Sequence, residues 1–182
     1  MKINGDTVDQ STIDTAGFVA QLRSYLESGE VVASVELDEI VGLVRGRGLL
    51  PAAVSDIAGS PGKITAKVHA DRLPGLTGAK KMAAKAAGAI GVTVTSEMTD
   101  TTFTAVIAAS ARGINVSEMV AGEIRKVLAR VPRTVPAGMV SVRTGDGRTM
   151  VDVDLARVAE QYEVRLKTIE IGDVITLTAE RA

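Results

Sequence analysis

Residues Gly147–Ala159, GRTMVDVDLARVA, decide the fold class of this chain, because a turn glycine, an alternating strand, an acidic residue and the start of a helix follow one another there. Residues Gly29–Val41, GEVVASVELDEIV, have the same order of features at a constant offset. Apolar residues at every second position direct one face of a strand toward a core. Each stretch therefore predicts a strand that runs directly into a short helix.

Two further pairs of segments keep the same order along the chain. Ala16-Gly17 aligns with Ala121-Gly122, and Val68–Arg72 aligns with Leu177–Arg181. Chance is the alternative explanation, since short alternating strands resemble one another. The aligned segments predict two degenerate repeats within a single domain of residues 1–182: a first repeat of about 11–73, a middle helix and hairpin of 77–110, and a second repeat of about 115–182.

Helix and turn signals divide the rest of the chain into short elements. Helices are predicted between Ser11 and Gly29 and at residues 38–44, 79–88, 116–131 and 156–162. Strands are predicted at residues 31–37, 54–57, 63–70, 91–98, 102–110, 139–144 and 148–155, followed by a hairpin over 163–180. Because most successive strands are joined by short turns, the fold class predicted is α+β, with a mainly antiparallel sheet packed on amphipathic helices.

The composition excludes several classes of function. Hydrophobic residues make up 46% of the chain but aromatic residues only 2%, so the core must be aliphatic. The 21 basic and 22 acidic residues leave a net charge of −1, so no nucleic-acid partner is expected. The chain has no cysteine, which excludes disulfides and thiolate metal sites and fits a reducing compartment.

Neither an export signal nor a membrane span is visible in the sequence. The N-terminal residues are polar, and the longest apolar stretch, Met82–Val94, is interrupted by Lys85 and is shorter than the roughly 20 residues that cross a bilayer. These features predict a cytoplasmic protein without a transmembrane segment. A mature fragment that carries an added methionine would have the same N-terminus, so removal of an export signal stays an alternative.

The residues with catalytic side chains form no recognisable set. His69 is the only histidine, so a metal site made of several histidines is impossible. The strand alternation places His69 on the solvent side. Asp152 and Asp154 lie on the outward face of their strand, where carboxylates usually keep the surface wet. Lys63 follows a glycine but precedes Ile64 rather than a serine or threonine, so no phosphate-binding loop is present. We therefore expect no enzyme activity, no catalytic residues, no cofactor and no metal site.

The helix predicted at 116–131 has the most regular apolar stripe in the chain, with residues spaced for one helical face. This stripe is the candidate wall of a ligand groove or the candidate subunit interface: Val120, Ile124, Val127, Leu128 and Val131. Arg45 and Arg47 form a candidate anion contact, because guanidinium groups bind oxyanions through two hydrogen bonds. A polar helix exit explains the same two arginines equally well.

The C-terminal part of the chain resembles a known family. Thr149–Leu155, a short helix, Val164–Lys167 and Gly172–Ala179 together resemble the end of bacterial tubular lipid-binding proteins (TULIP-like, LmeA-type phospholipid-binding proteins), and Val35–Val41 is similar to a short helix entry near their beginning. The resemblance implies a curved sheet wrapped along a long helix, with an apolar groove for acyl chains. It covers roughly a third of the chain and assigns no individual ligand contact, because those contacts are spread over apolar wall positions.

Two functions of different classes follow from these observations. The aliphatic composition, the mean hydropathy of +0.20 and the family resemblance favour a non-enzymatic binding module for a lipid or another apolar ligand in a groove between sheet and helix. The same surplus of aliphatic surface could instead serve a self-assembling structural or interaction protein, a homo-oligomer without a small-molecule ligand. The sequence does not determine the ligand, the oligomeric state or the pathway.

Overall fold

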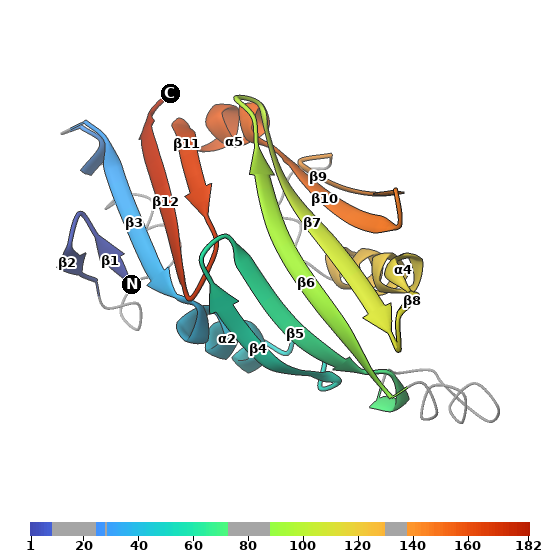
Figure 1. Cartoon of the computed structure of the whole chain (residues 1–182). Helices are drawn as coiled ribbons and strands as arrows, with labels where there is room; N and C mark the ends of the chain where they lie inside the picture. The colour runs from blue at the N-terminus through green and yellow to red at the C-terminus, as the bar shows by residue number, and fades with distance from the viewer. Residues whose placement is uncertain (9–24, 28, 73–87, 130–137) are drawn as a thin grey trace.

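A computed structural model of the chain describes residues 1–8, 25–27, 29–72, 88–129 and 138–182. Two predicted helices, between Ser11 and Gly29 and at 79–88, lie almost entirely outside these residues, as does Val131. The described part of the chain contains mainly antiparallel strands together with helices (Figure 1), so the predicted α+β class is confirmed.

The described strands form two sheets, where the sequence predicted one. The five-stranded sheet contains β1 Lys2–Ile3, β2 Asp6–Thr7, β3 Val31–Glu36, β11 Val164–Glu170 and β12 Val174–Arg181, in the order β11-β12-β3-β1-β2. The seven-stranded sheet contains β4 Val54–Ser60, β5 Lys63–His69, β6 Ala89–Met98, β7 Thr102–Ala111, β8 Ile114–Asn115, β9 Val140–Gly145 and β10 Arg148–Asp154. Its order is β4-β5-β6-β7-β10-β9, and β8 also pairs with β7.

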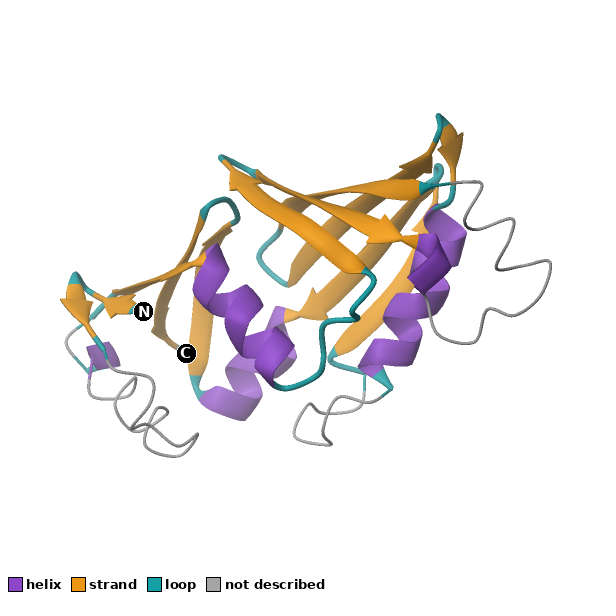
Figure 2. Ribbon diagram, turned by 90° about the horizontal axis from the view of Figure 1, so that it is seen from below, coloured by secondary structure: helices purple, strands orange, loops and turns teal. Residues whose placement is uncertain are grey.

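The helices lie on one side of the two sheets (Figure 2). They are α2 Leu37–Gly46, α4 Ser117–Leu128 and α5 Leu155–Tyr162, and a 3-10 turn covers Ala70–Arg72. The predicted helices at 38–44 and 156–162 are confirmed, and the helix predicted at 116–131 is confirmed as far as Leu128.

Both stretches that contain the repeated pattern fold as predicted, with a strand that runs directly into a helix. At the second, the side chain of Asp154 caps α5 by accepting a hydrogen bond from the backbone N–H of Arg157 at 3.1 Å. At the first, Glu36 provides no side-chain cap, and the Leu37 N–H instead donates to the Asp173 carbonyl at 2.8 Å. The leucines that begin α2 and α5 are both buried.

The two strand–helix units cross between the sheets in opposite directions. Helix α2 leads from β3 in the five-stranded sheet to the β4–β5 hairpin in the seven-stranded sheet. Helix α5 leads from β10 in the seven-stranded sheet to the β11–β12 hairpin in the five-stranded sheet, where β12 pairs with β3. Each sheet therefore contains one hairpin that follows, in the sequence, a strand and helix that begin in the other sheet.

The turns of these two delivered hairpins touch one another. The Gly62 N–H donates to the Ile171 carbonyl at 2.9 Å. At Gly59 a Cβ would overlap backbone atoms of Gly172 and Asp173, so the backbones of the two hairpins approach too closely for any side chain there. We call this contact, made by residues 59–62 and 171–173, the turn junction.

Aliphatic side chains fill two core clusters. One supports the five-stranded sheet and consists of Ile3, Val8, Leu26, Val31 and Ala179. The other lies between the seven-stranded sheet and α4, and consists of Ala70, Ile90, Ala109 and Ala111, with Val68, Val92, Val116 and Val120 packed against it. Val68 on β5 and Ala70 in the following 3-10 turn both contribute to this second cluster.

Replacement of Gly59 by alanine is expected to lower the free energy of unfolding by about 1–3 kcal/mol, because the added methyl group overlaps the backbone of the opposite turn. Gly91→Ala in the interior of β6 is the matched control, since the added Cβ would lie 3.8 Å from the Ser110 carbonyl oxygen, an ordinary van der Waals distance. That control should be neutral or more stable by about 0.5–1 kcal/mol. Urea denaturation measures both, and equal effects of the two changes would contradict the close approach at the turn junction.

Candidate ligand-binding site

The apolar stripe of α4 lies against the seven-stranded sheet. Val120 packs against the buried cluster of that sheet, and Ile124 and Leu128 are half-buried. The side chain of Val127 and all of Val131 lie outside the described residues. Neither of the two large cavities described below is lined by this stripe, so its role as groove or interface stays a prediction.

A cavity of about 710 Å³ lies between the two sheets, which we call the inter-sheet cleft. Residues Arg165–Glu170 of the edge strand β11 form one wall, and Met98–Asp100 at the β6–β7 turn form the other. Its apolar lining consists of Met98, Leu166 and Ile169. Because β11 and β6 belong to different sheets, the cleft depends on how the two sheets meet.

Ile169 connects the inter-sheet cleft to the apolar face of the five-stranded sheet. Its register partners in the next two strands are Leu177 and Ala33, which pack against the core of that sheet. All three side chains are half-buried. The cleft is therefore continuous with a row of aliphatic side chains.

A register shift in β11 explains why Ile169 was missed in the sequence. Leu166 pairs with Ala179 but Thr168 pairs with Thr178, so Lys167 is an extra residue in the strand. This β-bulge moves the next inward side chain to Ile169, three residues after Leu166. The three-residue spacing of apolar residues within a predicted strand is a sequence signal that could have revealed it.

Charged side chains at the edge of the inter-sheet cleft largely neutralise one another. Glu180 on β12 pairs with Lys167 at 3.0 Å and with Arg165 at 3.5 Å. Asp100 and Glu170 add two carboxylates to the lining. The lining of the cleft thus combines three apolar side chains with polar and oppositely charged ones.

A second cavity, of about 510 Å³, lies over β5, β6 and β7. Gly91, Ala108 and Ser110 contribute small side chains to its lining, and an ion pair of 3.0 Å joins Lys67 to Asp56 at its margin. No large aliphatic side chain other than Val92 lines it. This cavity therefore lacks the larger apolar side chains, Met98, Leu166 and Ile169, that line the inter-sheet cleft.

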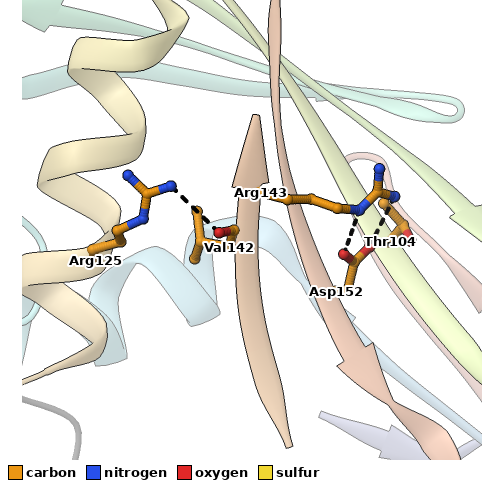
Figure 3. A network of polar contacts seen from close by, with 5 residues as sticks. All are labelled: Thr104, Arg125, Val142, Arg143 and Asp152. Atoms are coloured by element: carbon orange, nitrogen blue, oxygen red, sulfur yellow. Dashed lines mark hydrogen bonds and ion pairs between the residues drawn. The ribbon is translucent and has the colours of Figure 1, made fainter. Parts of the chain in front are cut away.

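Asp152, predicted on the outward face of its strand, belongs to a network of polar contacts that joins three strands and leaves its side chain only partly exposed (Figure 3). Its carboxylate accepts hydrogen bonds from Arg143 Nε at 2.6 Å and from Thr104 Oγ1 at 2.7 Å. The bond from Arg143, with a smaller contribution from Thr104, lowers the pKa of Asp152 against the opposing effect of burial. Alternation along one strand could not show these cross-strand partners. The acceptor oxygens are engaged, which favours a structural role.

His69 is half-buried rather than fully exposed, because the neighbouring strand supplies a partner. Its Nε2 lies 2.9 Å from the hydroxyl oxygen of Ser55 on β4. Among the described residues no carboxylate contacts His69, so the orienting acid of a catalytic triad is not in place there.

Arg45 and Arg47 lie at the end of α2, where both are exposed. Within the described part of the chain, neither forms an ion pair. Cationic side chains at the end of a helix interact favourably with its last carbonyl groups. This local role accounts for their position, and the proposed anion contact stays a prediction.

Among the described residues, no group of three or more acidic or histidine side chains is arranged to hold a metal ion. No helix of this part of the chain is long and apolar enough to cross a membrane. No protein-family model matches the chain, and no curated protein or solved structure matches it.

Asp152→Asn is expected to lower stability at neutral pH but not in acid. The folded-state pKa lies below the unfolded value of about 3.9, so the carboxylate stabilises the fold above that pH and loses this effect as the pH falls through the folded value. The urea denaturation midpoint of the variant should lie below that of the unmodified protein at pH 7, and the two midpoints should lie closer together at about pH 3. Asp146→Asn, in the exposed β9–β10 turn, removes the same charge as a control. A difference independent of pH would contradict the role assigned to Arg143.

Val120→Ala is expected to destabilise the protein by about 1–2 kcal/mol, because it removes two carbons from the packed side of α4. Met119→Ala, at an exposed position on the same helix, should change stability by less than about 0.5 kcal/mol. Thermal unfolding compares the two. If Val120→Ala lost a bound ligand without losing stability, the ligand would lie at α4 rather than in the inter-sheet cleft.

Proposed function

We propose that this chain is a non-enzymatic binding module for a lipid or another apolar ligand, which it holds in the inter-sheet cleft. The observation that carries this proposal is Ile169, which joins a cavity of about 710 Å³ to the half-buried aliphatic row of the five-stranded sheet. Ligand pockets of about 300–1,000 Å³ are typically lined by apolar side chains with a few polar groups. The proposal moves the ligand from the α4 stripe to the space between the sheets.

The finer features of the predicted architecture belong to the same proposal. Two strand–helix–hairpin units, β3-α2-β4-β5 and β10-α5-β11-β12, support the interpretation of two degenerate repeats. The resemblance to tubular lipid-binding proteins suggests an acyl chain as the apolar part of the ligand and a curved form for the sheets. The cysteine-free sequence supports a cytoplasmic location for this binding module.

Ile169→Glu is the direct test, because it places a charge in the apolar lining of the cleft. Native mass spectrometry of protein purified from cells, followed by organic extraction, is expected to show a co-purified apolar molecule with the unmodified protein. The variant should retain at least about tenfold less of it, which corresponds to about 1.4 kcal/mol of binding free energy.

Val32→Glu is the matched control, since Val32 is an exposed residue on the opposite face of the same sheet. This variant should retain the ligand as the unmodified protein does. Circular dichroism establishes that both variants are folded. Equal retention by the two variants, or the absence of any apolar molecule in the unmodified protein together with no uptake of a fluorescent fatty acid, would refute the proposal.

A further inference from the structure

Strand β9 is an edge strand that is both longer than β2 and free of the register shifts seen in β4 and β11. β4 and β11 each contain a register shift, and β2 is only two residues long. β9 pairs with β10 over six residues without a shift and contains no proline. Bulges and short strands are devices that protect sheet edges from further pairing. Among the described strands, β9 is thus the long, regular edge.

The turn of the β9–β10 hairpin determines which backbone groups of β9 point outward. Asp146 and Gly147 form a two-residue turn, so Gly145 and Arg148 make a hydrogen-bonded pair. Alternation from there directs the N–H and C=O groups of Val140, Val142 and Thr144 away from β10. One contact bears this out: Arg125 Nη2 on α4 donates to the Val142 carbonyl at 3.4 Å (Figure 3).

We propose that β9 pairs with β9 of a second copy of this chain, antiparallel about a two-fold axis at Val142. In this register Val142 exchanges two backbone hydrogen bonds with Val142 of the partner copy, and Val140 does the same with Thr144 of the partner copy. The two seven-stranded sheets would then continue into one another. With a two-fold axis, the outward N–H and C=O groups of β9 form hydrogen bonds in both copies at once, as expected for an isologous dimer.

The side chains of β9 are compatible with a second copy as the partner. Val142 faces its own equivalent, and Ser141 faces Arg143 of the partner copy, so no like charges lie directly opposite. Each Arg143 is already neutralised by Asp152 in its own chain at 2.6 Å. The net charge of −1 adds little repulsion between two copies.

Arg125 is the element that opposes this pairing. It must leave the Val142 carbonyl before the partner strand can bind there, and its equivalent in the second copy lies near the same axis. The contact is long at 3.4 Å and the side chain is exposed, so both arginines can turn toward solvent. Loss of the Arg125 side chain should therefore strengthen the association of two copies.

Val142→Pro tests the proposal with little effect on the fold. The Val142 N–H points away from β10, so proline keeps the β9–β10 pairing but removes the outward donor and places its ring in the path of the partner. Sedimentation velocity over a range of concentrations should show a dimer for the unmodified protein and a monomer for Val142→Pro. Val142→Ala keeps the N–H and should still associate. Arg125→Gln should associate about tenfold more tightly.

A cysteine variant tests the register without proline. The chain has no cysteine, so Val142→Cys should form a disulfide-linked dimer on mild oxidation, because hydrogen-bonded antiparallel partners lie about 5.5 Å apart at Cα. Thr168→Cys on the bulged edge β11 should not. A monomeric unmodified protein at about 100 μM, unchanged association of Val142→Pro, or equal cross-linking of the two cysteine variants would each overturn the proposal.

Discussion

The turn junction is the constraint on which the rest of the structure depends. The β4–β5 hairpin of the seven-stranded sheet meets the β11–β12 hairpin of the five-stranded sheet at this junction. A backbone hydrogen bond joins Gly62 to Ile171, and no room remains for a side chain at Gly59. The Leu37 N–H at the start of α2 bonds to the same turn. The junction therefore positions the first crossover helix and both sheets together. The inter-sheet cleft exists because this contact and the two crossovers place β11 beside the β6–β7 turn.

The two sheets use their apolar residues in different ways. The helix side of the seven-stranded sheet is closed by α4, whose Val120 packs among small buried side chains. In the five-stranded sheet, Ala33 and Leu177 pack against the core, and their neighbour Ile169 lines the inter-sheet cleft. A chain with so few aromatic residues can still offer a ligand a continuous apolar surface, provided that aliphatic residues of adjacent strands stand in register. This difference between the sheets, rather than the regularity of any one helix, is the reason why we propose the cleft as a ligand site.

Local sequence patterns predicted the helices and strands well. They could not predict how the strands pair into sheets, because pairing joins residues far apart in the sequence. Alternation located most of the strands, and helix and turn signals separated them into short elements, because both kinds of signal depend on neighbours in sequence. The division into two sheets depends on β12 pairing with β3, which no local pattern specifies. For the same reason Asp152 was expected to face solvent, although Arg143 and Thr104 of adjacent strands bind it. Gly59 did carry a usable signal, since glycine inside a strand often marks the close approach of another backbone.

The reciprocal crossovers also affect how the chain can reach its folded state. Val31 pairs with Ala179, so the five-stranded sheet joins strands from nearly opposite ends of the chain. Pairings this distant in sequence slow folding, because loop-closure entropy must be overcome before the contacts form. During synthesis on the ribosome, β3 emerges long before β12 and its apolar face has to wait for a partner. The five-stranded sheet can therefore be completed only after every strand of the seven-stranded sheet has left the ribosome, because β11 and β12 follow them in the sequence.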